Sequence, residues 1–361
     1  MAYEVYIVYS RQMTAPPEKL VRHGKPVFGT FDGMPASLDI RGVYRPFGVL
    51  PLPTFITDLR IRSSLVYIFN TDEYIGVVSF LDLKIVGQGE VLFWNKQTGR
   101  KYVYHTVTGP RRRLISKNTQ QGGCISFGRR RYIRIGWDRG KQIMSFVCNL
   151  KGDSARPDVA AAVKSDLAHD SFRALSAVLP APTMRRCKAV WTMTAPLAGS
   201  VSFHAKNQPP ISNGLQGSVL FKSVRSYNKL RTRSREAWGT GKVDEKTVSF
   251  SISSSSLDAV NPDTYNENVL FVDGELTPLP PVKITFPFGI RGKWIIQDTE
   301  NMVDLSFTPI SDYSRTVSLM ILRAQKHIMY GTFEGMLKTK DGKEIPLKDF
   351  SGMVRKQLMR L

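Results

Sequence analysis

The chain has 361 residues, a length that fits two domains of about 180 residues, each large enough to bury its own core. Hydrophobic residues make up 42% of it and charged residues 22%, which excludes an intrinsically disordered chain. The 51 lysines and arginines against 30 acidic residues give a formal net charge of +21. Such a surface attracts anions, so the partner could be RNA, an anionic membrane surface or an acidic protein polymer. The net charge alone does not distinguish among these partners.

Cysteine content and the first residues indicate the compartment. The three cysteines, Cys124, Cys148 and Cys187, form no CxxC motif, and an odd, sparse set of this kind indicates free thiols in a reducing environment. The opening "MAYEVYIVYSRQM" alternates and includes Glu4, so it predicts a strand and no signal or transit peptide. No apolar run reaches the roughly 18 residues of a transmembrane helix. We expect a soluble, cytoplasmic protein.

Hydrophobic residues recur with a period of two along most of the chain, which predicts β-strands. In "TDLRIRSSLVYIF", Leu65 and Tyr67 fall on one side, and "YIGVVSFLDLKIV" follows as a long apolar strand. In "CISFGRRRYIRIGW", Ile133, Ile135 and Trp137 share one face. Later strands are predicted in "KTVSFSISSSS", "NVLFVDG", "VDLSFTPI", "SLMILRAQKHIMYGTFEGML" and "KEIPLKDF". The polar, glycine-containing segments "KQTGRK", "WDRGKQ", "FVDGEL" and "KTKDGKE" are typical of hairpin turns.

Two segments depart from this pattern. "RPDVAAAVKSDLAHD" carries Val159, Val163 and Leu167 at four-residue spacing, which predicts a short amphipathic helix. The tail "GMVRKQLMRL" fits either a helix or a closing strand. Pro180 and Pro182 follow the first segment and cannot lie in a central strand, so we place the domain boundary there.

Many antiparallel strands with little helix predict an all-β fold, and long apolar strands favour closed barrels because closure removes sheet edges. We expect two tandem antiparallel β-barrels, an N-terminal domain of residues 1–181 and a C-terminal domain of residues 182–361. The hexapeptides "FGTFDG" (28–33) and "YGTFEG" (330–335) resemble each other, but matches within glycine-rich turns are more often coincidence than duplication.

The first candidate site is Asn266, Glu267 and Asn268, which directly precede the apolar strand "VLFV". A glutamate at a barrel mouth, or between barrels, can donate a proton while amides orient a substrate, and partial burial raises its pKa toward neutrality. Alternatively, the polar side chains only cap backbone groups of the turn, which is the more frequent situation in loops of this composition.

A second candidate lies in "WIIQDTENMVDL". Asp298 and Glu300 share strand parity and can form a carboxylate pair for acid–base chemistry, with Glu300 as the catalytic candidate. More often, such a "DTENM" segment is a hairpin tip with both acids in water. Trp191 and Trp294 are the candidate wall residues of a ligand cavity.

Other common sites are not indicated. The histidines show no metal-binding spacing, and no HExxH motif or Cys/His cluster occurs, so we expect no metal and no cofactor. "GQGEVLFW" is not a GxGxxG motif and opens a strand, where a dinucleotide fold requires a helix. A GxSxG nucleophile elbow is missing as well.

Basic residues gather in "GPRRRLISK", "GRRRYIRIGW" and "YNKLRTRSREAW". The members of the last segment are spaced by two and would align on one face of a strand beside Tyr227. Such stripes can bind phosphates or carboxylates, although the solvated outer face of a barrel explains them equally well. The candidate residues for binding an anionic partner are Arg111, Arg112, Arg113, Arg129, Arg130, Arg131, Arg134, Lys229, Arg231, Arg233 and Arg235.

The segments "YNENVLFVDGELTPLPPV", "GKWIIQDTENMVDLSFTPI" and "IMYGTFEGMLKTKDGKEIPLKDFSG" resemble the C-terminal half of the "domain of unknown function 2804" family. "HDSFRALSAVLPAPTMRRCKAVWTMTAPLAGSVSF" and "DLRIRSSLVYIFNTDEYIGVVSFLDLK" also look similar to it, so the resemblance spans most of the chain. The family resembles lipocalin-like two-barrel proteins that include carotenoid hydratases and fungal cyclase-like enzymes. The resemblance implies calycin-type barrels and an apolar ligand cavity, but no assigned reaction.

Two functions follow as hypotheses. In the first, a lipocalin-like protein holds an apolar small molecule in a barrel and hydrates, isomerises or cyclises it. In the second, a non-catalytic structural module docks through its basic strips on an acidic assembly, such as the microtubule lattice (tubulin) or a ribonucleoprotein (RNA). A pocket protein should contain a cavity lined by aromatic and aliphatic side chains with one buried acid, whereas a docking module should have filled barrels and a contiguous arginine face. We favour the first by a small margin.

Overall fold

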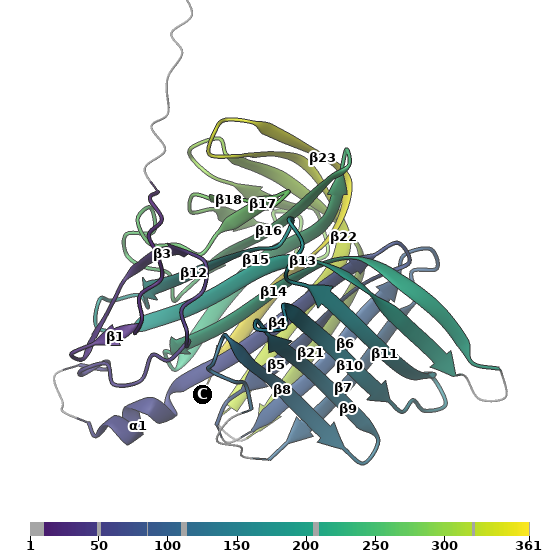
Figure 1. Ribbon diagram of the computed structural model, residues 1–361, viewed down its shortest axis with the longest axis horizontal. Helices are drawn as coiled ribbons and strands as arrows, with labels where there is room; N and C mark the ends of the chain where they lie inside the picture. The colour runs from purple at the N-terminus through teal and green to yellow at the C-terminus, as the bar shows by residue number, and fades with distance from the viewer. Residues whose placement is uncertain are drawn as a thin grey trace, which may run out of the picture.

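The computed structural model describes residues 11–48, 52–84, 86–109, 114–204, 209–319 and 322–360. These residues form two large antiparallel sheets and one short helix, α1 (Thr54–Leu59), which confirms the predicted all-β class (Figure 1). A small two-stranded sheet, β1 (Val21–Arg22) with β2 (Lys25–Pro26), lies apart from them.

The first sheet has 12 strands and forms a nearly closed barrel. Ten of them follow one another in the order β7-β6-β5-β4-β14-β13-β11-β10-β9-β8, and β12 pairs with β13 and β3. At the two ends of this path, Thr106 on β7 shares a hydrogen bond with Ser126 on β8, so the edges meet. The strands are β3 (Gly29–Asp32), β4 (Ile61–Thr71), β5 (Tyr74–Asp82), β6 (Gly87–Asn95), β7 (Lys101–Thr108), β8 (Gln121–Gly128), β9 (Arg131–Asp138), β10 (Ile143–Leu150), β11 (Asp158–Asp166), β12 (Arg173–Pro180), β13 (Cys187–His204) and β14 (Ile211–Tyr227).

The second sheet has nine strands in the order β18-β17-β16-β15-β23-β22-β21-β20-β19 and curves into a half-barrel. Two barrel-like units are therefore present, as expected. The strands are β15 (Arg231–Val243), β16 (Lys246–Ser255), β17 (Val269–Val272), β18 (Glu275–Pro278), β19 (Lys283–Thr285), β20 (Trp294–Gln297), β21 (Val303–Leu319), β22 (Leu322–Lys338) and β23 (Glu344–Arg360).

The chain passes from the first sheet to the second between Tyr227 and Arg231. The predicted domain boundary between residues 181 and 182 falls instead in the turn that joins β12 to β13, and both of these strands belong to the first sheet. Division into folding units of residues 1–181 and 182–361 stays a prediction, whereas the change of sheet lies near residue 229.

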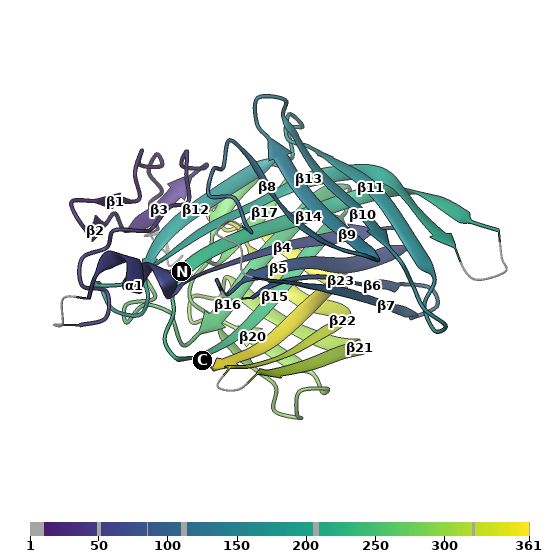
Figure 2. The same cartoon turned by 90° about the horizontal axis from the view of Figure 1, so that it is seen from below.

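The two sheets pack against each other along β4, β14 and β15 (Figure 2). On β4, Leu65 and Tyr67 point into the first barrel, and Val66 and Ile68 belong to an apolar layer shared with the second sheet. Since both faces of the strand are buried there, its middle, residues 65–69, is apolar at every position, as is usual for strands covered on two sides.

The predicted helix in residues 156–170 is wrong, because Asp158–Asp166 form strand β11 between β10 and β13. A spacing of four residues is two full repeats of a strand as well as about one helical turn. Val159 and Val163 therefore both point into the barrel from a strand, and both are buried. The tail is a strand, β23, one of the two alternatives left open for it.

Hairpin turns form where the glycine-containing segments predicted them. In the turn between β17 and β18, Asp273 and Gly274 have φ of 46° and 79°, the left-handed conformation that a tight hairpin requires. The three cysteines are free and buried, in agreement with the sequence. Among the described residues, no helix is long and apolar enough to cross a membrane.

Gly335 closes the second of the two similar hexapeptides and lies at a bulge in the pairing of β22 with β23. Its φ is 125°, and a Cβ there would lie 2.1 Å from the carbonyl oxygen of Asp304. Replacing it with alanine is expected to lower the free energy of unfolding by at least about 2 kcal/mol, because strain and collision act together. Urea unfolding measures the loss.

Gly99 provides the matched control for this substitution. It has a φ of 65°, but a Cβ there would meet nothing within 4 Å, so Gly99→Ala is expected to cost only about 1 kcal/mol. Equal losses in the two variants would contradict the collision at Gly335.

Candidate functional site

Glu267 lies between the two sheets, directly before β17, and is 3% exposed. Its carboxylate contacts two lysines of the first sheet, Lys188 on β13 at 2.7 Å and Lys222 on β14 at 2.9 Å. Ser253 on β16 donates a hydrogen bond to the same carboxylate. The acid singled out in the sequence is therefore buried, and it is ion-paired with two lysines and accepts a hydrogen bond from Ser253.

The neighbouring amides cap the backbone. Asn268 accepts a hydrogen bond from the Ser253 N–H at 2.8 Å and donates to the Pro280 carbonyl at 2.8 Å. Asn266 accepts from the Asn268 N–H at 3.0 Å and donates to the Pro262 carbonyl at 3.1 Å. These contacts correspond to the turn-capping interpretation of the segment.

The pKa of Glu267 is shifted opposite to the direction expected from partial burial. Desolvation alone would raise it, but Lys188 and Lys222 together hold the pKa of this carboxyl well below its usual range. Conversely, burial would lower the pKa of Lys188, yet the charge of Glu267 raises it. The two lysines thus favour the ionised form of the Glu267 carboxyl.

These ion pairs continue along the interface as a charged seam, defined here as Lys188, Glu267, Lys222, Glu236 and Arg355. Glu236 lies 3.8 Å from the Lys222 ammonium and accepts a hydrogen bond from Arg355 Nε at 2.7 Å. Every member of the seam is buried or half-buried. The seam joins β13 and β14 of the first sheet to β15 and β23 of the second.

The two candidate tryptophans belong to the cores of the sheets. Trp191 packs edge-on against Trp137 in the first barrel. Trp294 donates to the Ile290 carbonyl at 2.8 Å and packs on Phe286 in the second unit. Neither lines the cavities described below.

Asp298 and Glu300 lie in the tip between β20 and β21, as the hairpin interpretation expected. The Asp298 carboxylate accepts the backbone N–H groups of Met302 and Val303 at 3.2 and 3.1 Å. Glu300 is ion-paired with Arg11, one of whose nitrogens donates to it at 2.9 Å. The two carboxylates therefore have different partners, and their role as an acid–base pair stays a prediction.

The basic segments are distributed over separate places. Arg111, Arg112 and Arg113 lie outside the described residues. Arg129 and Arg130 form the exposed turn between β8 and β9. On β9 itself, Arg134 is exposed, whereas Arg131 is half-buried and donates a hydrogen bond to the His105 carbonyl at 2.8 Å.

The predicted four-residue stripe is shorter than expected. Lys229 precedes β15, and Tyr227 ends β14 as a buried core residue. Only Arg231, Arg233 and Arg235 share one face of the strand, and Arg235 lies over the Phe286 ring.

One end of the first barrel contains an open depression of about 570 Å³, a size usual for small-molecule sites. Four aromatic side chains from four strands, Tyr74, Phe93, Tyr102 and Phe203, contact one another there. Phe93 and Tyr102 stack with ring centroids 4.8 Å apart, and Phe203 lies 5.4 Å from Tyr102. Tyr102 and Phe203 are only half-buried, so part of this aromatic cluster faces the depression.

Polar groups form the rim of the same depression. The Asn213 amide donates to the Glu73 carboxylate at 2.8 Å and lies 3.5 Å from the Tyr74 hydroxyl. Burial raises the pKa of Tyr74, so its phenol is protonated at neutral pH and can donate a hydrogen bond. A carboxylate, an amide and a phenol therefore meet above an aromatic floor.

Beneath the aromatic cluster lies a second, smaller cavity of about 30 Å³ inside the barrel. Its wall is formed by aliphatic and aromatic side chains and Cys148, and Tyr74 lines both this cavity and the depression. Ala161 on β11 is one of the lining residues, and its small side chain does not fill the cavity. Tyr74 is therefore the residue that the mouth and the interior cavity share.

Sequence reasoning did not single out these mouth residues. Phe93, Tyr102 and Phe203 look like ordinary members of alternating strands, and only pairing of β6 with β7, together with the far end of β13, brings their rings together. The sequence offers one signal for the mouth. Glu73 lies in the turn between β4 and β5, and Asn95 ends β6 before the next turn, so both polar residues are at strand ends.

Comparison with known proteins gives a family for part of the chain. Residues 227–361 match the family model described as Domain of unknown function (DUF2804), which confirms the predicted family there. No curated protein matches. Kievitone hydratase from Nectria haematococca is 13% identical, with 82% of this chain and 87% of that chain covered and a TM-score of 0.44. A Nitrosomonas europaea protein provisionally named an AttH is 8% identical, with 86% and 97% covered and a TM-score of 0.47.

Proposed function

We propose that this protein, a lipocalin-like chain whose residues 227–361 match the DUF2804 family, holds an apolar small molecule at the mouth of its first β-barrel. The observation that supports this most is the apolar cavity directly beneath the aromatic floor of an open depression. The interior cavity has an apolar wall, whereas the depression also carries charged side chains, among them Glu73, Arg100, Asp153 and Arg156. An apolar interior with polar groups that orient the ligand is the usual composition of such sites.

The dimensions determine how a ligand would lie. The interior cavity of about 30 Å³ accommodates only a small apolar group, whereas the depression of about 570 Å³ accommodates a ring system. We therefore place the body of the ligand on Tyr102 and Phe203, with an apolar end directed past Tyr74 into the barrel. Stacking on these rings and removal of apolar surface from water supply the affinity.

Hydration, isomerisation and cyclisation each require a proton donor and a proton acceptor beside the ligand. At the mouth, Tyr74 can donate and Glu73 can accept, with Asn213 holding the two in place. Catalytic roles for Glu267 and Glu300 stay predictions, since the contacts of Glu267 support a structural role. We propose the mouth residues as the site of any such chemistry.

Filling the interior cavity is expected to weaken ligand binding. N-phenyl-1-naphthylamine, an uncharged apolar fluorophore, should bind the wild-type protein saturably, and Ala161→Phe should weaken its Kd at least about tenfold because the cavity no longer exists. Fluorescence titration measures both constants. Ala161→Leu serves the same purpose if the larger side chain prevents folding, which near-UV circular dichroism shows.

Ala162 supplies the matched control, because it neighbours Ala161 on β11 but is exposed on the outer face of the barrel. Ala162→Phe should leave the Kd unchanged. Absence of saturable binding to the wild-type protein, or equal binding by the Ala161 and Ala162 variants, would sink the proposal.

No arrangement of the described residues supports the alternative of docking on tubulin or RNA. The exposed arginines of β9 and β15 belong to different sheets, and Arg131 and Arg235 are engaged with the protein itself. That alternative stays a hypothesis from charge alone.

A further inference from the structure

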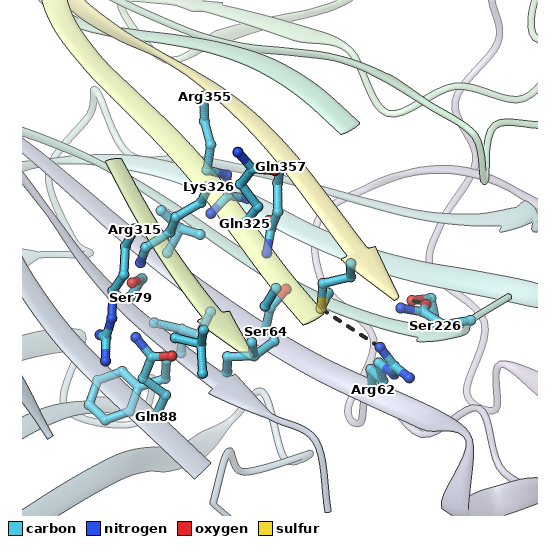
Figure 3. Close-up of a pocket in the computed structure, with 18 residues that line it drawn as sticks. Arg62, Ser64, Ser79, Gln88, Ser226, Arg315, Gln325, Lys326, Arg355 and Gln357 are labelled. Carbon is cyan, nitrogen blue, oxygen red and sulfur yellow. Dashed lines mark hydrogen bonds between the residues drawn. The ribbon is translucent and has the colours of Figure 1, made fainter. Parts of the chain in front are cut away.

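A third cavity, of about 90 Å³, lies between the two sheets, separate from the barrel mouth. Strands β4, β5 and β6 of the first sheet form one wall, and β21, β22 and β23 of the second form the other. Figure 3 shows side chains from both walls directed into the space between the sheets, with Arg62 near one end and Arg315 near the other.

The cavity wall carries an excess of positive charge. Four cations line it: Arg62, Arg315, Lys326 and Arg355. Glu90 is ion-paired with Lys326 and Arg315, and Glu236 is ion-paired with Arg355. The four lining cations are therefore met by two carboxylates, Glu90 and Glu236.

Of the four cations that line the cavity, Arg62 is the one for which no ion pair is found among the described residues. Within the part of the chain that the structure describes, no carboxylate lies within 4.0 Å of its guanidinium, whose one hydrogen bond shown is a weak contact of 3.7 Å to the Met359 sulfur (Figure 3). Burial and the nearby Arg60 lower the pKa of Arg62 to about 10, so it remains charged at neutral pH. An unpaired, half-buried charge is costly, and an anion supplied from solution would stabilise it.

The remaining lining limits what that anion can be. Gln88, Gln325 and Gln357 offer amide donors, whereas Val317, Ala324 and Met359 offer an apolar surface. A guanidinium binds a carboxylate or phosphate through two parallel hydrogen bonds. The volume admits one such group and a short chain, and the apolar surface favours a carboxylate with a short aliphatic tail.

We propose that the cavity between the sheets is a binding site for a small oxyanion, preferentially a short-chain carboxylate, with Arg62 as its principal anchor. The site differs from the proposed apolar site in position and in chemistry, since it lies outside the barrel lumen and has no part in the aromatic cluster. Either proposal can therefore fail without the other.

Isothermal titration of the full-length protein tests this site, with propionate and inorganic phosphate as separate probes at constant ionic strength. We expect saturable binding of propionate to the wild-type protein. Arg62→Gln should weaken it at least about tenfold, because the charge-assisted hydrogen bonds disappear while no carboxylate is left unpaired. Arg62→Lys, which keeps the charge but loses the planar fork, should bind with intermediate affinity.

Arg186→Gln is the control, because Arg186 is also a half-buried arginine of the first sheet region but lies over Phe47, away from the cavity. It should bind propionate as the wild type does. Saturable binding of phosphate and not of propionate would support an oxyanion site that prefers phosphate to a carboxylate. Failure of both anions to bind saturably, or an equal loss in the Arg62 and Arg186 variants, would overturn the proposal.

Discussion

Replacing Glu267 with alanine is expected to lower the free energy of unfolding by about 3–5 kcal/mol, because it leaves the ammonium groups of Lys188 and Lys222 buried without their shared partner. Removing one member of a buried ion pair costs far more than the pair itself contributes, since the remaining charge stays desolvated. Urea unfolding followed by circular dichroism measures the loss.

Glu344 supplies the control for this variant. It is ion-paired with Lys338 at 3.1 Å, but its side chain is 54% exposed, so Glu344→Ala is expected to cost less than about 1 kcal/mol. A loss of that small size in Glu267→Ala would contradict the structural role assigned to the seam.

The contribution of Glu267 to the free energy of unfolding depends on pH in a defined direction. The pKa of Glu267 is lower in the folded protein than in the unfolded chain, so its contribution to stability is fully present above about pH 4.3 and is lost as the pH falls below that value. Asp258 acts in the opposite sense. Burial raises its pKa to about 6, and its contribution is lost as the pH rises through 6.

The second large effect is expected at Glu90, whose side chain is completely buried on β6. It is ion-paired with Lys326 on β22, lies 3.4 Å from Arg315 on β21, and accepts a hydrogen bond from Tyr313 at 3.2 Å. Glu90→Ala therefore removes the group that connects the first sheet to two strands of the second. We expect a loss of about 3–5 kcal/mol.

Calorimetry can also show whether the two sheets then unfold apart. Because the wild-type sheets share an apolar layer and two sets of ion pairs, they should unfold together, and Glu90→Ala should separate the transition into two. Glu334→Ala is the comparison, since this glutamate is 54% exposed and lies 4.0 Å from Lys293. One unchanged, cooperative transition in the Glu90 variant would refute this coupling.

The β-class and many hairpin turns could be predicted because alternation and glycine-containing turns are local properties of the chain. The error at β11 shows the limit of this reasoning, since Val159 and Val163 satisfy a strand and a helix alike. Only the pairing of β11 with β10 and β13, which depends on distant residues, decides between them.

The site was less predictable for the same reason. Glu267 stood out in the sequence, but its partners Lys188 and Lys222 lie on strands earlier in the chain, and no local pattern links them to it. A signal did exist, because Lys222 interrupts the strand "SVLFKSVRSY" among apolar residues, where a solvent-facing lysine is uncommon. The aromatic cluster at the barrel mouth had no such signal.

The polarity of the buried ion pairs reverses along the interface. At Glu267 the first sheet supplies the cations and the second sheet the anion, whereas at Glu90 the first sheet supplies the anion and the second the cations. Each sheet therefore presents both buried cations and a buried anion to the other. Apolar surfaces alone tolerate several packing arrangements. We infer that these charges give the packing of the two sheets its specificity, because another arrangement would leave buried charges unpaired.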